Sequence, residues 1–526
     1  MNTNLEQLHK SAIAALNRGD LHVVHNYCES ILGANPAHAD AWFLLAMVAA
    51  NTGKLQQALE LIDKALSITP QVADYLAQKA KLLIMLRHDK AARTCADKAV
   101  ALNPQGALLL DTLGVVYTNL GDYAQARELL NKAVALKPEH LQFRFNLATA
   151  EQFLGNLSVA KAHYLKAIEI KPNYARAYWA LSELNKENLD GSRVDAMERL
   201  LEQKSLSTED GLYLSHALSR EYEQRGHYTK SFKCLQQAKT RRRQELSYSL
   251  EQDIAIFQQL QQAFANLDLV ASGDNNLGES CIFIVGMPRS GTTLTERIIS
   301  AHSTVESLGE LQNFGLAVRR SVDTNSRLML NSEIVKLALA VDAHKIGDSY
   351  LASVQQRRSQ APFFIDKMPL NFLYIGFIAR CLPKAKIICV ERNPMDVCLS
   401  NFRQLFALNF SYYNYHYDIE DTARYIIAFH QLMSFWKTQL PGRIHTVNYE
   451  TLTEEPAKHI QELLSYFGLD WENACLNFHE NTAAVATPSA SQVREKLYKR
   501  AVGRWKHYEE QLAGVKDLFD QAGIKY

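Results

Sequence analysis

The sequence predicts an α-solenoid over the first half of the chain, followed by a three-layer α/β domain with a mostly parallel sheet. The first half keeps one period, because prolines recur every 34 residues at positions 36, 70, 104, 138 and 172. In the second half, apolar segments of strand length alternate with helical patterns, which is typical of a parallel sheet covered by helices. The first of those segments leads directly into a glycine-containing loop at residues 286–291.

The bulk composition excludes several classes of protein. The 526 residues carry 57 basic and 56 acidic side chains, a formal net charge of +1, which favours neither a nucleic-acid-binding nor a membrane-surface protein. The eight cysteines form no CxxC pair, so reduced thiols are favoured over a disulfide framework or a zinc site. The first residues lack the pattern of a signal peptide, and no run of about 18 apolar residues occurs. We therefore expect a cytoplasmic protein without membrane insertion.

Three further columns of residues keep the 34-residue step. They are alanine at 65, 99, 133 and 167, glycine at 19, 53, 121 and 155 with Arg87 interrupting, and small residues at 46, 80, 114 and 148. A unit of this length is a pair of antiparallel helices, in which glycine suits the turn, small residues allow close approach, and proline ends the second helix. Since one unit cannot cover its own apolar face, the units should stack into a solenoid.

The segment Gly121–Ala126, followed by Ala133 and Pro138, resembles a tetratricopeptide repeat, and residues 226–238 resemble a degenerate unit. We expect the repeat array to span residues 1–245 and a helical linker to follow at residues 246–278. The resemblance implies that the array binds a peptide or protein partner. A structural spacer or a dimerisation arm is the alternative, and the oligomeric state stays open.

The second domain is expected at residues 279–526 and begins with a phosphate-binding arrangement. Cys281–Val285 has the pattern of a strand, the loop Gly286–Gly291 follows, and a helix begins near Thr292. In such an arrangement the backbone N–H groups and the helix N-terminus point at an anion. The loop is P-loop-like, yet Thr292 stands where a nucleoside triphosphatase has lysine. The missing lysine argues against a triphosphate ligand and a magnesium-dependent kinase.

The loop residues carry a second resemblance. The run Arg289, Ser290, Gly291, Thr292 and Thr293 resembles the 5′-phosphosulfate loop of sulfotransferases that use 3′-phosphoadenosine 5′-phosphosulfate (PAPS), especially the tyrosylprotein sulfotransferase branch. The resemblance extends in order over residues 280–510. It implies an enzyme that moves the sulfonate of its co-substrate PAPS to an acceptor hydroxyl, of which a protein tyrosine is one candidate. The scheme requires no metal.

The same resemblance assigns a site for the 3′-phosphate of the donor. Lys386–Glu391 is a second expected strand, which delivers Arg392 and then a helix that contains Ser400. Arg392 and Ser400 match the family's 3′-phosphate pair. An arginine can hold a phosphate through two charge-assisted hydrogen bonds. The alternatives are a surface ion pair for Arg392 and an ordinary polar helix position for Ser400.

Two residues match the catalytic positions of the family. Glu310 stands at the position of the glutamate that takes the proton of the acceptor, whereas Glu306 is expected to be an ordinary surface residue. Lys367 follows an expected strand at Phe363–Asp366. By resemblance it would stabilise the charge that develops on the leaving phosphate. An exposed loop lysine is the alternative for Lys367.

The remaining candidates lie toward the C-terminus. Tyr449 ends a fourth expected strand, and by resemblance it lies near the nucleotide, while a half-buried strand-end tyrosine is the alternative. Ser489 and Arg494 match a closing segment that contacts the 3′-phosphate or the adenine. The aromatic stretch Phe410–Tyr417 either lines the acceptor entrance or packs on the repeat array.

The acceptor stays open at this stage. Gln312 stands where the tyrosylprotein branch has an arginine used in acceptor recognition, so a sugar, a lipid or a small phenol competes with a tyrosyl peptide. Two other functions are alternatives: a repeat-based interaction scaffold whose second domain is inactive, and a nucleotide kinase.

Overall fold

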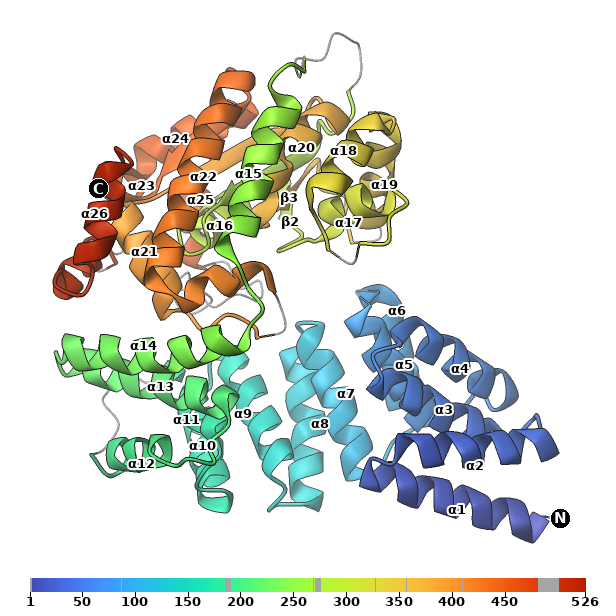
Figure 1. Ribbon diagram of the computed structural model, residues 1–526. Helices are drawn as coiled ribbons and strands as arrows, with labels where there is room; N and C mark the ends of the chain where they lie inside the picture. Colours follow the sequence, from blue (N-terminus) through green and yellow to red (C-terminus); the bar gives the residue numbers. More distant parts are fainter. Residues whose placement is uncertain are drawn as a thin grey trace. The chain divides into compact units, whose positions relative to one another are not determined.

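The computed structural model of the protein describes residues 2–86, 88–184, 191–267, 269, 276–326, 328–355, 357–408, 411–480 and 501–526. The chain forms two compact units, which comprise residues 1–187 and 188–526. Figure 1 shows helices alone in the first unit and a mixed arrangement of helices and strands in the second.

The first unit is a row of paired helices, which confirms the predicted α-solenoid. The helices are α1 (Asn2–Arg18), α2 (Leu21–Ala34), α3 (Ala39–Asn51), α4 (Leu55–Ile68), α5 (Ala73–Met85), α6 (Asp89–Ala101), α7 (Ala107–Asn119), α8 (Tyr123–Leu136), α9 (Leu141–Leu154), α10 (Leu157–Ile170) and α11 (Ala175–Leu184). The recurrent prolines stand two or three residues after the ends of α2, α4, α6, α8 and α10.

The columns of small residues have the structural roles expected of them. The glycines at 19, 53, 121 and 155 lie in the turns between paired helices with φ of +77° to +87°, a left-handed conformation that glycine adopts at little cost. The alanines at 46, 80 and 148 are fully buried. In the same column, a Cβ atom added at Gly114 of α7 would lie 2.5 Å from Leu130 Cγ of α8. Close packing of paired helices therefore requires these small side chains.

The second unit opens with four helices, α12 (Gly191–Leu201), α13 (Thr208–Gln224), α14 (Tyr228–Glu245) and α15 (Leu250–Phe264). Gly226, with φ of +77°, forms the turn between α13 and α14, as in the preceding repeats. These two helices, called the α13–α14 hairpin below, lie in the same compact unit as the sheet. The boundaries at residues 245 and 278, drawn from sequence pattern, stay predictions.

A five-stranded sheet forms the centre of the second unit. Its strands are β1 (Cys281–Gly286), β2 (Val305–Ser307), β3 (Phe363–Asp366), β4 (Lys386–Glu391) and β5 (Ile444–Asn448). The order is β2-β3-β1-β4-β5, and every neighbouring pair is parallel. The expected strands are present, whereas β2 was not anticipated because three residues are too short for a recognisable pattern.

Helices cover both faces of the sheet, which gives the predicted three layers. Alternate residues of β1 point to opposite faces: Ile282 and Ile284 join one apolar cluster with α16 and α24, while Phe283 and Val285 join another with α15, α20 and α22. The helices after β1 are α16 (Thr292–Ile299), α17 (Asn313–Arg320), α18 (Ser332–Ala340), α19 (Ala343–Gln355), α20 (Ile375–Cys381), α21 (Pro394–Arg403), α22 (Ile419–Gln439), α23 (Tyr449–Glu454), α24 (Pro456–Phe467), α25 (Asn473–Leu476) and α26 (Ala513–Gln521). Short 3₁₀ segments are η1 (Pro369–Tyr374), η2 (Ser411–Tyr417), η3 (Phe478–Glu480) and η5 (Arg504–Tyr508).

In the part of the chain that the structure describes, none of the helices is long and apolar enough to cross a membrane.

Replacing Gly114 by valine tests the close approach of α7 and α8. Because the new Cβ would collide with Leu130, we expect Gly114→Val to lower the free energy of unfolding by about 1–3 kcal/mol, the usual cost of overpacking. The measurement is urea unfolding followed by circular dichroism. Gly33→Ala in α2 is the matched control, since nothing lies within 4 Å of the added atom. Equal stability of the two variants would contradict the packing argument.

Candidate functional site

The sequence-predicted residues gather at the carboxyl edge of the sheet. β1 ends at the loop 286–291, β3 is followed by Lys367, β4 by Arg392 and β5 by Tyr449. Glu310 lies three residues after the end of β2. Because all five strands are parallel, their carboxyl ends meet at one edge, where ligands of open α/β sheets bind.

The phosphate-loop candidate has a backbone that requires its glycines. Gly286 has φ of +150°, and a Cβ atom there would lie 2.6 Å from the carbonyl oxygen of Val390 in β4. Gly291 has φ of +111°, and a Cβ atom there would lie 2.5 Å from Cδ2 of Tyr449. Arg289 is left-handed without being glycine, with φ of +68°, a conformation that costs energy and clusters at functional sites. The loop is thus held in a strained shape at the start of α16.

Asn401 of α21 connects this loop to the segment η2 through two hydrogen bonds. Its Nδ2 donates to the carbonyl oxygen of Pro288 at 2.7 Å, and its Oδ1 accepts from the hydroxyl of Tyr415 at 2.9 Å. Among the described residues, the buried hydroxyl of Ser290 has no hydrogen-bond partner. Buried polar groups usually have a hydrogen-bond partner, and this hydroxyl stands beside a helix N-terminus, which attracts anions. Asn401 is fully buried and was not found from the sequence.

Arg392 is a buried cation in contact with three parts of the site. Its side chain is 9% exposed, and its guanidinium lies 4.6 Å from the ring centre of Tyr449. Nη1 donates to the carbonyl oxygen of Arg289 at 3.2 Å, and Nη2 donates to that of Ala501. Nε is buried without a hydrogen-bond partner among the described residues. Arg392 is therefore not the surface ion pair that was its alternative.

Tyr449 contacts Arg392, and Ser400 lies on the helix that follows it. Tyr449 is 9% exposed and lies between the guanidinium of Arg392 and the loop glycine Gly291, so it joins the two expected phosphate sites. Ser400 is partly buried on α21, the helix that begins two residues after Arg392.

Glu310 and Lys367 form an ion pair at the same edge. Lys367 is fully buried, and its Nζ donates to Oε1 of Glu310 at 2.5 Å. The side chain of Glu310 is 40% exposed, so the carboxylate faces outward and the cation lies behind it. Lys367 is therefore not an exposed loop lysine. Glu306 is paired elsewhere, since it accepts from the backbone N–H of Ser359 at 2.8 Å and lies 3.8 Å from Arg358.

A second carboxylate contacts the same lysine. Oε2 of Glu296 lies 3.6 Å from Nζ of Lys367, and Oε1 accepts from the hydroxyl of Ser307 at 2.5 Å. Burial raises the pKa of Glu296, an effect that the charge of Lys367 opposes. Sequence reasoning missed Glu296, although its spacing of four residues from Thr292 would have placed both on one face of the helix.

Asp366 anchors the strand end that carries Lys367. It is buried, and it accepts hydrogen bonds from the hydroxyl of Tyr350 at 3.0 Å and from Nδ2 of Asn371 at 3.3 Å. Burial raises the pKa of Asp366 to about 8. This neighbour holds the backbone of Lys367 in place and was also missed in the sequence.

The sequence left two alternatives for the aromatic stretch, the acceptor entrance and packing on the repeat-like helices. The structure shows contacts of both kinds. On one side, Nε2 of Gln312 donates to the hydroxyl of Tyr412 at 3.1 Å. Burial and the charge of Glu310 raise the pKa of Tyr413. On the other side, Nζ of Lys239 in α14 lies 5.6 Å from the ring centre of Tyr417. The described part of the stretch, residues 411–417, thus contacts both the candidate base region and the α13–α14 hairpin, while Phe410 lies outside the described residues.

Ser489 and Arg494 lie outside the described residues, so their expected contacts with the nucleotide stay predictions. Within the described ranges, no group of three or more His, Cys, Asp or Glu side chains is arranged to hold a metal ion.

Comparison with known proteins identifies both parts of the chain. A model of the sulfotransferase family matches residues 281–473. Models of the tetratricopeptide repeat match residues 9–73, 86–140 and 118–184.

Among curated relatives, an uncharacterized protein of Aquifex aeolicus is 30% identical over 353 residues, which make up 65% of this chain and 46% of that protein. The match therefore spans about half the length of this relative. A candidate protein-tyrosine sulfotransferase of Caenorhabditis briggsae is 26% identical over 238 residues, 43% of this chain and 81% of that protein.

Among solved structures, a tetratricopeptide repeat protein of Parabacteroides merdae is 17% identical with a TM-score of 0.34, and the match covers 47% of this chain and 94% of that one. The family models agree with the repeat array and the α/β domain seen in the structure. Residues 281–473 of this chain are thus similar to the sulfotransferase family, and segments within residues 9–184 are similar to tetratricopeptide repeats.

Proposed function

We propose that the protein is a PAPS-dependent sulfotransferase, which moves the sulfonate of PAPS to an acceptor hydroxyl. The observation that carries this proposal is the ion pair of Glu310 and Lys367, 2.5 Å apart at the sheet edge that also holds the phosphate-loop candidate. A carboxylate that is partly exposed can receive a proton from an incoming acceptor. A buried cation behind it can stabilise charge on a leaving group.

The donor would lie across the carboxyl edge of β1 and β4. Its 5′-phosphosulfate would be held by the loop and the start of α16, through Arg289, Ser290, Gly291, Thr292 and Thr293. The unpartnered hydroxyl of Ser290 supports this placement.

The 3′-phosphate would lie at Arg392 and Ser400, with Tyr449 beside the nucleotide. The buried Nε of Arg392, which has no partner among the described residues, supports that assignment. Ser489 and Arg494 stay predicted contacts of the nucleotide.

The proposed chemistry is a single in-line transfer. Glu310 takes the proton of the acceptor hydroxyl while the acceptor oxygen forms a bond to sulfur. At the same time the bond between sulfur and the bridging phosphate oxygen breaks, and both of its electrons stay on that oxygen. Lys367 stabilises the resulting charge on adenosine 3′,5′-bisphosphate. Catalysis in this scheme rests on positioning and on charge stabilisation in a partly buried site.

Glu296 has a distinct task in this scheme. When Glu310 becomes protonated, Lys367 loses the charge of its nearest partner. Glu296, at 3.6 Å, then remains as the negative group that compensates the buried ammonium, because an uncompensated buried charge is costly. We assign Glu296 as a positioning residue for Lys367.

The acceptor we propose is the hydroxyl of a tyrosyl peptide, which the tetratricopeptide repeats would present as a peptide- or protein-binding array. The name of the Caenorhabditis relative, the hydrogen bond of Tyr412 to Gln312 and the effect of the Glu310 charge on Tyr413 support this choice. Gln312, bound to Tyr412, replaces the arginine of the tyrosylprotein branch, so a small phenol is the main competing acceptor.

Calorimetric titration tests the donor site first. We expect adenosine 3′,5′-bisphosphate to bind with micromolar affinity, about −8 kcal/mol, and ATP to bind far more weakly. Arg392→Ala should weaken bisphosphate binding at least about tenfold, since a buried charge-assisted contact is lost. Arg424→Ala is the control, because Arg424 forms an exposed pair with Glu420 on α22. Tighter binding of ATP than of the bisphosphate would favour a nucleotide kinase, and binding of neither would favour the scaffold.

Replacing the candidate base separates chemistry from binding. We expect Glu310→Gln to bind adenosine 3′,5′-bisphosphate as the wild type does, but to transfer sulfonate about 10²–10⁴-fold more slowly, because general-base catalysis is lost. Transfer is measured with radiolabelled PAPS against a panel of tyrosyl peptides and phenols. Glu306→Gln, four residues earlier in the chain, is the control and should keep its activity. An active Glu310→Gln variant would rule out Glu310 as the base.

Removing the second carboxylate tests the assignment of Glu296. Glu296→Gln should lower kcat by about tenfold or more, because Lys367 would lose the carboxylate of the protein that still holds its ammonium group once Glu310 is protonated. The affinity for adenosine 3′,5′-bisphosphate should stay within about twofold of wild type. Steady-state kinetics and calorimetry on the same preparation supply both values. A variant with unchanged kcat would show that Lys367 does not depend on Glu296.

A further inference from the structure

One buried carboxylate of the α13–α14 hairpin contacts two segments of the α/β domain. Glu223 lies in the last turn of α13 and is 9% exposed. Its Oε2 accepts from Nη2 of Arg403 in α21 and lies 2.8 Å from Nη2 of Arg504. Its Oε1 accepts from Nε of Arg504 at 3.0 Å and from the hydroxyl of Tyr508 at 2.9 Å. A single side chain of the hairpin thus holds α21 and the segment Ala501–Tyr508, called the C-terminal strap below.

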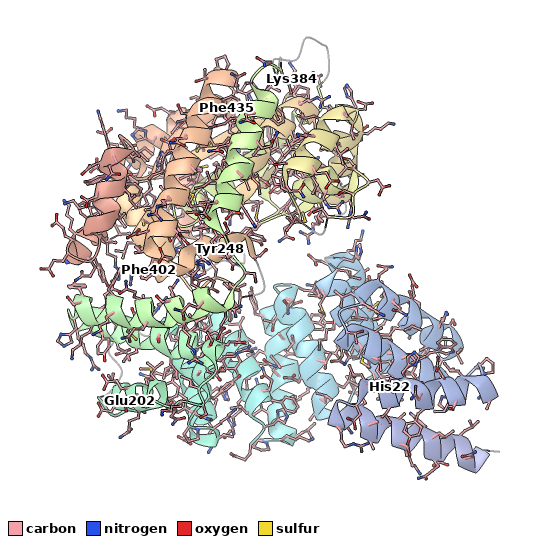
Figure 2. The ribbon with its side chains drawn as sticks, viewed as in Figure 1. His22, Glu202, Tyr248, Lys384, Phe402 and Phe435 are labelled. Carbon is pink, nitrogen blue, oxygen red and sulfur yellow. The ribbon has the colours of Figure 1, made fainter. Side chains whose placement is uncertain are left out.

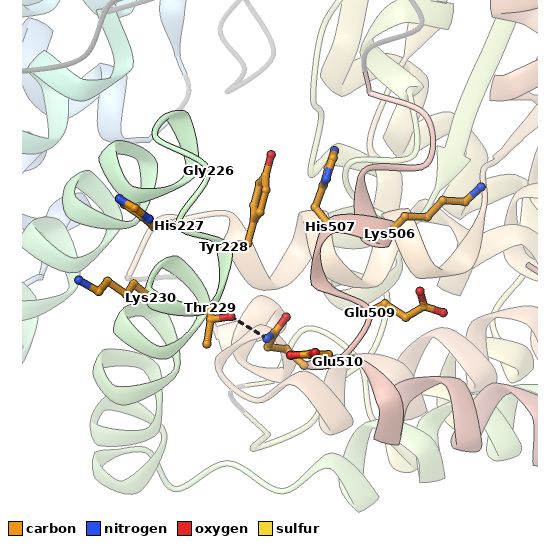
Figure 3. A pocket seen from close by; sticks show the side chains of 10 residues that line it. Gly226, His227, Tyr228, Thr229, Lys230, Lys506, His507, Glu509 and Glu510 are labelled. Atoms are coloured by element: carbon orange, nitrogen blue, oxygen red, sulfur yellow. Dashed lines mark hydrogen bonds between the residues drawn. The ribbon is translucent and has the colours of Figure 1, made fainter.

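Two further contacts attach His507, near the end of the strap, and Gln511, just beyond it, to the same hairpin. Figure 3 shows Tyr228 and His507 facing each other, and their rings are stacked with centres 4.6 Å apart and an interplanar angle of 10°. Below them, the hydroxyl of Thr229 accepts from Nε2 of Gln511 at 3.2 Å. The turn of the hairpin and residues 506–511 therefore line the two sides of the pocket that Figure 3 draws.

The other end of the strap reaches Arg392. Asp396, which is 2% exposed, accepts from the backbone N–H of Gly503 at 2.7 Å and from that of Trp505 at 3.1 Å. Asp396 also lies 3.7 Å from Arg392, whose Nη2 donates to the carbonyl oxygen of Ala501. The orientation of the Arg392 guanidinium therefore depends on where the strap lies.

The charge of Glu223 adds to the hydrogen bonds of Asp396 in holding the strap and α21 together. Burial raises the pKa of Glu223, but the charges of Arg403 and Arg504 outweigh that effect, and the pKa is lower than usual. Nη2 of Arg403 and Nη2 of Arg504 both contact Oε2 of Glu223, so the two guanidinium groups are close enough to repel. The charge of Arg403 accordingly lowers the pKa of Arg504. Without the carboxylate between them, these two cations would push the strap away from α21.

The hairpin itself has an anchor that does not involve the strap. Lys239 of α14 is fully buried, and its Nζ donates to the carbonyl oxygens of Gln404 and His416 at 3.2 Å each. Phe402 of α21, labelled in Figure 2, is stacked on Phe232 of α14 with ring centres 5.1 Å apart. Loss of the Glu223 charge should therefore release the strap and leave the hairpin in place.

We propose that Glu223 is a positioning residue of the 3′-phosphate site: it holds the C-terminal strap against Asp396 and Arg392, so that the repeat-like α13–α14 hairpin completes the donor site. The identity of the ligand rests on the proposed function, whereas the strap's dependence on Glu223 does not. Glu223 does not contact the ligand; it acts through Arg504, the strap and Arg392.

Hydrogen exchange of the ligand-free full chain tests whether Glu223 holds the C-terminal strap in place. In Glu223→Gln, the amides of Gly503 and Trp505 should exchange at least about tenfold faster than in the wild type, because the strap opens locally. The amides of β1 and α14 should be unchanged. Glu198→Gln is the matched control, since Glu198 also accepts a hydrogen bond from a tyrosine of α13, Tyr222, and within the described part of the chain it forms no hydrogen bond to the strap. Unchanged exchange of the strap in Glu223→Gln would overturn the proposal.

Calorimetry with adenosine 3′,5′-bisphosphate tests the coupling to the site. The Kd of Glu223→Gln should rise about tenfold, Glu223→Asp should recover part of the loss, and Glu198→Gln should match the wild type. Equal affinity of Glu223→Gln and wild type would overturn the proposal while the donor assignment stands. If the wild type does not bind the bisphosphate, the proposed function fails, and with it the role of Glu223 in donor binding; the exchange experiment then decides whether Glu223 holds the strap.

Discussion

The parallel pairing of β1 with β4 is the constraint on which the candidate site depends. Its register places Gly286 opposite Val390, so the loop after β1 and Arg392 after β4 leave the sheet side by side. Gly286 has no side chain that would collide with the Val390 carbonyl. The adjoining pairing of β4 with β5 brings Tyr449, after β5, beside Arg392 and against Gly291. Both expected phosphate sites thus follow from one strand register.

The site holds two cations away from water, and each has its own compensation. Lys367 has two carboxylates, one partly exposed and one buried. Arg392 has the ring of Tyr449, the carboxylate of Asp396 and two backbone carbonyls. In a medium of low dielectric, such cations interact more strongly with a charged ligand than exposed ones would. Donor recognition and charge stabilisation are therefore properties of the folded core of the domain.

The α13–α14 hairpin is built like a repeat but packs as part of the α/β domain. Its buried contacts include the carboxylate of Glu223, the ammonium of Lys239 and the ring of Phe232. The four helices α12–α15 lie in the compact unit that contains the sheet. A sequence period identifies how helices pair locally, whereas the compact unit to which a pair belongs depends on where its side chains are buried.

The sequence by itself determined the repeat array, the strands β1, β3, β4 and β5, and the phosphate-loop candidate, because each has a local signal: a period of 34, an apolar run or a glycine-bearing turn. It also selected Glu310, Lys367, Arg392 and Tyr449, through the resemblance of their motifs to those of sulfotransferases. Only the tertiary structure brought in Glu296, Asn401 and Glu223, whose partners lie 71, 113 and 281 residues away in the chain at Lys367, Pro288 and Arg504. A buried polar residue has no local pattern, because its role is set by the charge that folding places beside it.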